Sequence, residues 1–403
     1  MSGLADSVLM KLPPGGERRL TLFGLLVIGI WFLAFNVYQE ARWLPNAQHN
    51  DFHYFYAAAQ IGLSHGWDRI YDPQLSVADI SASCPNSVAN PFIYPPVVAW
   101  LVLPLTPLPC MAGYTVFALL GLGMLVAAAL LVAVRGPLEK LCVVLSALGF
   151  LPTYTAFAAG QLSPLVTLAL VLAWRWLREG RQVAAGLALT TIVVKPQLGV
   201  LVPFALLAAG YTRAFRIWAI ATLVIILAFV VTLGQQGMEQ WIANQELLYW
   251  GSTYEQRWSL AYMFGPTAGL AGAVIAIASM LVIAGRSRGQ GPEVPLASGV
   301  AATFLIAYHL TPPDFVMMLI PVWILAVQRG RARVAAASLG WVASWFAVGL
   351  ALPVMIFEWA VLVLCAWAGR PGSRPAQPPG PAESLNLLQR RQGAEVPDPR
   401  RGW

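Results

Sequence analysis

Residues 111–134 read MAGYTVFALLGLGMLVAAALLVAV, a run of 24 residues without one charged side chain. A helix needs roughly 20 apolar residues to cross the hydrocarbon core of a bilayer. This run is therefore long enough to span a membrane. It is followed by Arg135 and Lys140, and basic residues of this kind mark the cytoplasmic end of a span.

The same pattern recurs along the chain. Hydrophobic residues make up 58% of the 403 residues and charged residues only 11%, whereas soluble domains carry roughly 25% charged residues. This composition excludes a water-soluble fold and predicts an all-α polytopic membrane protein. Thirteen apolar segments lie near 20–38, 94–108, 111–134, 141–158, 162–177, 183–194, 197–210, 217–234, 266–284, 296–311, 315–328, 334–351 and 353–369.

The positions of the basic residues predict the orientation. The net charge of +7 does not indicate a nucleic-acid partner, because these residues form short clusters between apolar segments. With both ends in the cytoplasm, all but four of the 25 Lys and Arg residues fall inside. Both ends inside require an even number of crossings. Segment 94–108 is short and rich in proline, so we expect it to be re-entrant, which leaves about 12 transmembrane helices.

This orientation divides the chain into three parts. We expect a cytoplasmic N-terminus over 1–19, one transmembrane unit over 20–369, and a disordered cytoplasmic tail over 370–403 that is rich in Pro and Gly. Outer loop 39–92 should contain short interfacial helices, and a second outer loop should cover 235–262. Cys84 and Cys110 both fall on the outer side and can pair there, although no spacing forces them to do so.

The first outer loop contains the leading candidate for catalysis. Residues 50–59 read NDFHYFYAAA, in which Asp51 precedes a group of aromatic rings. Partial burial raises the proton affinity of a carboxylate, which suits a general base. His49 and His53 flank Asp51 with spacing that is compatible with a metal, but no further ligands are spaced to complete such a site, so we expect no metal and no cofactor.

Lys195 is the second candidate. It lies within an apolar stretch, away from every cytoplasmic cluster, and Pro196 follows it directly. An ionisable group at membrane depth is costly and indicates a functional site, although a lysine can also extend to the outer interface. A proline at this point predicts a discontinuous helix that lines a cavity.

Three further polar residues face outward. His309 and Asp314 flank the turn Thr311-Pro312-Pro313, which can bring His309 near Asp51 and Lys195, and Asp314 is equally compatible with a simple polar turn. Arg257 is the basic residue of the second outer loop and can bind phosphate or lipid headgroups. We expect Asp51 and Lys195 to meet in one dry pocket on the outer side.

Short motifs in a fixed order resemble family 87 of the GT-C glycosyltransferases. The likeness covers most of residues 20–330. Its motifs are Asp51-Phe52 with Tyr56-Ala57-Ala58, Gly66–Pro73, Phe92–Pro96, Leu103–Leu105, Gly160–Pro164, Ala185-Gly186 and Lys195-Pro196-Gln197.

The resemblance implies a GT-C-type bundle and a function. Members of this family use polyprenyl-phosphate sugars, often mannose, on the outer face of the membrane. The resemblance implies that Asp51 is the catalytic base and that Lys195 and His309 face the donor phosphate. We add Arg257 from its chemistry, and we expect further substrate contacts from a set of four residues: His53, Tyr56, Tyr94 and Gln161.

The sequence therefore predicts an inverting glycosyltransferase in a bacterial plasma membrane, with its active site outside. It would transfer a hexose, mannose first, from a polyprenyl-phosphate sugar to a lipid or glycan acceptor. The alternative is a transporter or flippase of lipid-linked sugars, which the broken helix at Lys195 favours. The polar groups all on the outer side argue against alternating access. A third interpretation is a non-enzymatic assembly protein.

Overall fold

The computed structural model describes residues 16–43, 50–84, 87–88, 90–133, 136–251, 258–327 and 351–368. Every regular element in these ranges is a helix, and η marks a 3-10 helix. In chain order they are α2 Gly16–Trp43, α3 Asp51–Ser64, η2 Trp67–Arg69, α4 Pro73–Ser83, α5 Pro96–Val102, η3 Leu103–Leu105, α6 Cys110–Val132, α7 Pro137–Leu148, α8 Leu151–Ala158, α9 Ser163–Arg178, α10 Gln182–Leu189, η4 Thr190–Val194, η5 Pro196–Leu198, α11 Val202–Ala208, α12 Thr212–Gly251, α14 Leu260–Phe264, α15 Pro266–Arg286, α16 Glu293–Ile306, η6 Pro312–Met318, α17 Leu319–Val327 and α19 Ala351–Ala368. The tail 370–403 lies outside the described residues.

Three of these helices are long and apolar enough to cross a membrane: Cys110–Val132, Thr212–Glu246 and Pro266–Arg286. Helices α7 and α8 form a fourth candidate if their 56° bend is accommodated within one span. The prediction of an all-helical, multi-pass membrane protein is confirmed. The count of about twelve crossings stays a prediction, because several of the remaining apolar helices have only 10–17 residues.

The predicted break at Lys195 is present. Helix α10 ends at Leu189 and η4 ends at Val194, directly before Lys195, whose backbone is not helical (φ −155°, ψ 81°). The 3-10 helix η5 starts at Pro196, and α11 follows it. Proline cannot donate a backbone hydrogen bond and disfavours helical geometry in the residue before it. Lys195 therefore sits in the gap between two short helices.

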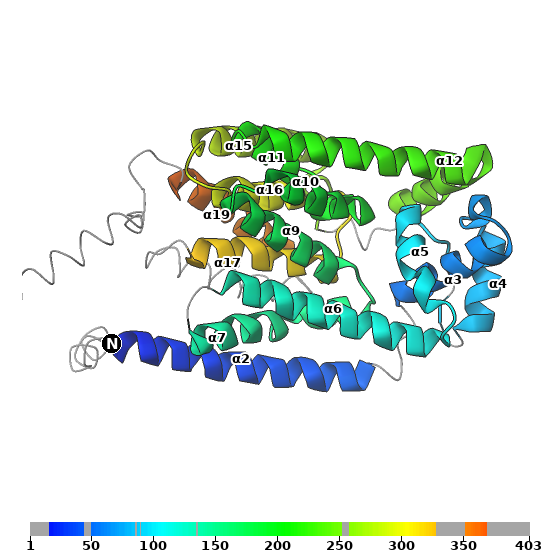
Figure 1. Ribbon diagram of the computed structural model, residues 1–403, viewed down its shortest axis with the longest axis horizontal. Coiled ribbons are helices and arrows are strands. Elements are labelled where there is room, and N and C mark those ends of the chain that lie inside the picture. Colours follow the sequence, from blue (N-terminus) through cyan, green and yellow to red (C-terminus); the bar gives the residue numbers. More distant parts are fainter. Residues whose placement is uncertain are drawn as a thin grey trace, which may run out of the picture. The chain divides into compact units, whose positions relative to one another are not determined.

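Short helices occupy residues 51–83, within the segment predicted as the first outer loop. Helix α3 packs against α4 and α5 and also contacts α6, and Figure 1 shows α3, α4 and α5 gathered at one end of the bundle, with the far part of α12 running alongside them. A disulfide joins Cys84, at the end of α4, to Cys110, the first residue of α6. This bond ties the small helical layer covalently to the bundle.

Two segments between the spans take less expected forms. Residues 96–105 form α5 and η3, an apolar helix too short to cross a bilayer, so the predicted re-entrant path stays a prediction. Within the segment predicted as the second outer loop, α12 continues to Gly251 after a kink at Gly234 (φ 57°, ψ −166°), and the position of this segment outside the membrane stays a prediction. Trp241 and Ile242 lie three and four residues after Met238, a spacing that gives this stretch a helical apolar face.

Candidate active site

Asp51 is the first residue of α3, and its neighbour Asn50 fixes its position. The Asn50 side chain accepts a hydrogen bond from the Phe52 backbone N–H (3.0 Å) and donates to the Ala158 carbonyl (3.3 Å). The Asp51 backbone N–H donates to the Ala159 carbonyl at 2.9 Å. Asparagine is a favoured helix cap because it satisfies a free N–H of the first turn. The start of α3 is thus bound to the end of α8.

Gly160 makes this contact possible. Its φ of +60° lies in the left-handed region, and a Cβ there would lie 2.1 Å from the Asn50 Oδ1 atom. Only glycine meets both conditions without strain. The turn that follows directs Gln161 towards Asp51.

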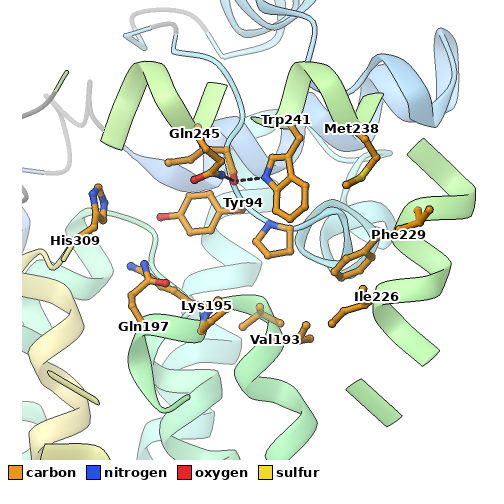
Figure 2. A pocket seen from close by; sticks show the side chains of 15 residues that line it. Tyr94, Val193, Lys195, Gln197, Ile226, Phe229, Met238, Trp241, Gln245 and His309 are labelled. Carbon is orange, nitrogen blue, oxygen red and sulfur yellow. Dashed lines mark hydrogen bonds between the residues drawn. The ribbon is translucent and has the colours of Figure 1, made fainter. Parts of the chain in front are cut away.

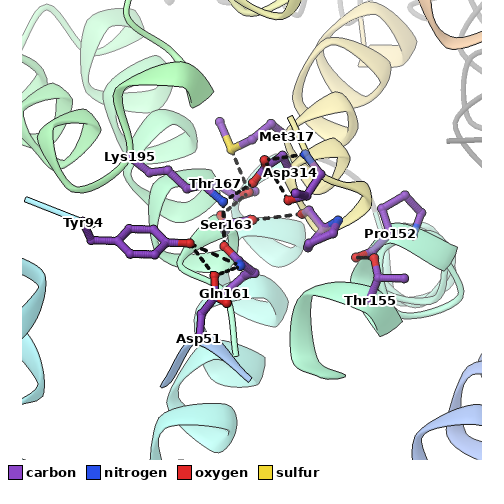
Figure 3. A network of polar contacts seen from close by, with 12 residues as sticks. Asp51, Tyr94, Pro152, Thr155, Gln161, Ser163, Thr167, Lys195, Asp314 and Met317 are labelled. Carbon is purple, nitrogen blue, oxygen red and sulfur yellow. Dashed lines mark hydrogen bonds and ion pairs between the residues drawn. The ribbon is translucent and has the colours of Figure 1, made fainter. Parts of the chain in front are cut away.

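The Asp51 carboxylate accepts two hydrogen bonds at one oxygen. The Tyr94 hydroxyl and the Gln161 Nε2 atom both donate to Oδ2 (Figure 3). Among the described residues, no donor reaches Oδ1. Burial raises the pKa of Asp51 above its ordinary value of 3.8, while the Tyr94 hydrogen bond, the Lys195 charge and the Gln161 hydrogen bond act in the opposite direction. Burial and the nearby Asp51 charge raise the pKa of Tyr94 well above its ordinary value, so its hydroxyl remains a donor.

Lys195 is held on the other side of Gln161. Its Nζ atom forms an ion pair with Asp314 Oδ1 at 2.5 Å and donates to Gln161 Oε1 at 2.6 Å. The Lys195 and Asp314 side chains are 3% and 0% exposed, so the pair is shielded from water. The structure thus brings Asp51 and Lys195 together with a single amide between them.

Asp314 is the functional-site residue that the sequence did not assign. It forms a capping box with Thr311, accepting from its backbone N–H (3.0 Å) and its hydroxyl (3.1 Å), so it does shape a turn. Its other oxygen binds Lys195, 119 residues away in the chain. Lys195 itself indicated that such a residue exists, because a cation in an apolar stretch requires a partner of opposite charge.

A cavity of about 400 Å³ adjoins this network. Lys195, His309 and Gln197 lie towards one end, and Phe229 and Ile226 lie towards the other (Figure 2). Asp51 is not among the lining residues. Tyr94 is the link, because it lines the cavity and donates to Asp51.

The extension of α12 holds the Tyr94 loop in place. The Trp241 indole N–H donates to the Ile93 carbonyl at 3.0 Å, and the Gln245 amide donates to the same oxygen. The Tyr71 hydroxyl also donates to the Tyr94 carbonyl, at 2.7 Å. The sequence did not assign these positioning roles, although the density of Trp and Tyr in 235–262 and in the first outer loop was a signal.

Two predicted substrate contacts have internal partners instead. His53 is buried and pairs with the Ser87 hydroxyl at 2.5 Å, and burial lowers its pKa to about 4. The Tyr56 hydroxyl donates to the carbonyls of Thr106 (3.2 Å) and Leu108 (2.8 Å). Neither residue lines the cavity, so both stabilise the packing of α3.

Two further candidates, Arg257 and His49, lie outside the described residues.

His53 lies near Cys84 and Cys110, and the potential metal-ligand atoms of these three residues are within 4.8 Å of one another. The two sulfurs are joined as a disulfide, so they are not thiolate ligands and the group offers only the histidine.

Comparison with known proteins gives one match. A model of glycosyltransferase family 87 matches residues 92–312, which is more than half of the chain. No curated protein and no solved structure matches. The matched range includes Tyr94, Gln161, Lys195 and His309. The chain belongs to glycosyltransferase family 87.

Proposed function

We propose that this membrane glycosyltransferase transfers a hexose, mannose first, from a polyprenyl-phosphate sugar to a lipid or glycan acceptor, with inversion and on the outer face. The observation that carries the proposal is the cavity with a cation at one end and apolar walls at the other, next to a desolvated carboxylate.

The apolar end of the cavity favours a lipid-linked donor. Ile226 and Val230 line the cavity and are 44% and 47% exposed on α12. They belong to a candidate membrane span, so their exposed surface faces lipid. A polyprenyl chain can enter from the bilayer along this surface while its phosphate reaches Lys195. A water-soluble nucleotide sugar has no apolar part to fill this end.

The polar end suits the leaving phosphate. A phosphate that departs from a sugar carbon gains negative charge, and positive groups in a site without water stabilise that charge strongly. Lys195 supplies the cation, and His309 lines the same cavity and can donate a hydrogen bond. The donor phosphate then shares Lys195 with Asp314.

Asp51 is the proposed base. The acceptor hydroxyl gives its proton to Asp51 Oδ1, its oxygen forms a bond to the anomeric carbon, and the bond from that carbon to the phosphate oxygen breaks. The products are the glycosylated acceptor and polyprenyl phosphate, and Asp51 later releases its proton to water. A carboxylate base opposite the leaving group is the usual arrangement for inversion at a sugar carbon.

We propose a bacterial plasma membrane as the location, and two observations support an active site on its outer face. The disulfide between Cys84 and Cys110 lies in the same layer as Asp51, and disulfides persist in oxidising compartments. The basic clusters follow the opposite ends of the apolar segments, as cytoplasmic signals do.

The test uses the purified protein in lipid vesicles with radiolabelled polyprenyl-phosphate mannose and a mixture of lipid and glycan acceptors, against protein-free vesicles. The same donor with glucose measures the sugar preference. Label in a new product, with release of polyprenyl phosphate, is the expected result. Label that crosses the bilayer on its original lipid, without product, would replace this proposal with a transporter.

A further inference from the structure

Gln161 joins the two charged parts of the site through one side chain. Its Nε2 donates to Asp51 Oδ2, and its Oε1 accepts from Lys195 Nζ at 2.6 Å. The residue is 6% exposed, and its backbone N–H is bound to the Ala156 carbonyl at 2.8 Å. Both ends of the amide are occupied by protein partners, which does not fit the substrate contact predicted from the sequence.

The partners permit only one orientation of this amide. An ammonium group has only donors, and an ionised carboxylate has only acceptors. A reversed amide would place N–H against the ammonium and C=O against the carboxylate, and both contacts would be repulsive. Lys195 cannot move away to relieve this, because Asp314 holds it from the other side. The Lys195–Asp314 ion pair therefore determines which group Gln161 presents to Asp51.

We propose that Gln161 is a positioning residue that links the cavity-lining Lys195 to the base Asp51. This inference rests on the proposed function, because it requires Asp51 to accept the proton. Lys195 polarises the amide, and the amide N–H favours the ionised form of Asp51. The N–H also occupies Oδ2, so that Oδ1 is the oxygen left for the acceptor hydroxyl.

The link also couples the two substrates. Lys195 lines the cavity, whereas Asp51 does not. A phosphate that binds Lys195 therefore acts on Asp51 through two successive hydrogen bonds, without touching it. Hydrogen bonds in such a chain polarise one another.

The experiment compares Gln161→Glu and Gln161→Met with wild type by the pH dependence of kcat/KM. The groups facing Asp51 are Tyr54 on α3, Tyr94 before α5, Lys195 after η4, and Asp314 in η6. Gln161→Glu keeps the acceptor for Lys195 but replaces the N–H by a like charge. The loss of the N–H donor and the added negative charge both disfavour the carboxylate form of Asp51. The fall in kcat/KM at low pH (the acid limb of the pH profile) therefore moves to higher pH by about one unit or more.

Gln161→Met removes the donor without adding charge, so it shifts the acid limb in the same direction by less. Gln74→Glu is the matched control, an exposed glutamine in the first turn of α4, and its profile overlays that of wild type. Thermal unfolding shows whether each variant is folded. If Gln161→Glu does not fold, the pH profile of Gln161→Met alone tests the positioning role.

The positioning role would be overturned if the acid limb of the kcat/KM profile lay at the same pH in both Gln161 variants as in wild type, whatever the change in rate. Failure of the proposed function looks different: Asp51→Asn would retain full transfer. The two failures can therefore be told apart in one set of assays.

Discussion

Asp51 and Asp314 lie in one polar network, but their surroundings differ. Asp314 binds a cation directly, the Lys195 ammonium at 2.5 Å, and its second oxygen accepts both Thr311 donors. Among the described residues, Asp51 accepts from two neutral donors, Tyr94 and Gln161, both at Oδ2. The charge of Asp314 is balanced by direct contact with the Lys195 ammonium, whereas the described partners of Asp51 are neutral.

This difference assigns the chemistry. A desolvated carboxylate without a direct cationic contact gains proton affinity, and burial raises the pKa of Asp51 in this way. Two acids whose surroundings differ in this way commonly divide their roles. Asp314 is therefore the counter-ion that holds Lys195, and Asp51 is the group suited to accept a proton.

The largest expected effect comes from Asp51→Asn. The amide has nearly the shape of the carboxylate but cannot take a proton, so kcat should fall by about 10²–10⁴-fold. The melting temperature should change little. The measurement is the rate of transfer from labelled donor at saturation, beside thermal unfolding of the same preparation. Full activity in this variant would remove Asp51 as the base.

The second effect concerns the ion pair. Asp314→Asn or Lys195→Met leaves one buried group without its partner, which should lower the free energy of unfolding by about 3–5 kcal/mol. The double change Lys195→Met with Asp314→Asn should recover part of that loss, since no charge is left buried and the asparagine oxygen can still accept from Thr311. Denaturant titration in detergent micelles measures all three variants. Singles as stable as wild type would show that the pair is not shielded from water.

The third effect is on pH. The base must be ionised, and burial raises the pKa of Asp51 above 3.8. As the pH falls through this raised pKa, Asp51 is protonated and kcat/KM should fall about tenfold per unit. The free energy of unfolding depends on pH in the opposite direction. The folded protein favours the protonated form of Asp51, so the stabilisation from this group is fully present below pH 3.8 and is lost as the pH rises through the raised pKa. An acid limb at or below pH 3.8 would contradict this assignment.

The smallest effect is expected at Arg69 and Asp72, the matched control for the buried pair. Their contact is also short (2.7 Å), but Arg69 is 40% exposed. Water screens such a pair, so Arg69→Ala should cost about 0–1 kcal/mol in the same titration. A loss equal to that of Lys195→Met would show that burial does not separate the two ion pairs.

Local pattern in the sequence predicted much of this architecture. Within the described residues, which leave out nearly all of the predicted run 334–351, the apolar runs coincide with helices. Pro196 predicted the gap at Lys195, because a helix break depends on neighbouring residues. The continuation of α12 past Gly234 was missed because its polar and aromatic side chains resemble an interfacial loop until packing selects one face.

The site was predictable only in part. Asp51 and Lys195 could be predicted as candidate site residues from their residue types and their positions in the sequence. Their connection is not, because Gln161 and Asp314 reach Lys195 across 34 and 119 residues. His53 and Tyr56 lie close to Asp51 in the chain, but a helix turns successive side chains to different sides, and both side chains have internal partners.

The anomeric configuration of the product tests the central claim most directly. Polyprenyl-phosphate mannose of defined configuration would be incubated with the purified protein, and the one-bond C1–H1 coupling of the new glycoside measured by NMR. Direct attack by an acceptor hydroxyl activated by Asp51 predicts a product of opposite configuration to the donor. A product with the donor's configuration would require a covalent sugar intermediate and would contradict the role of Asp51 as a general base.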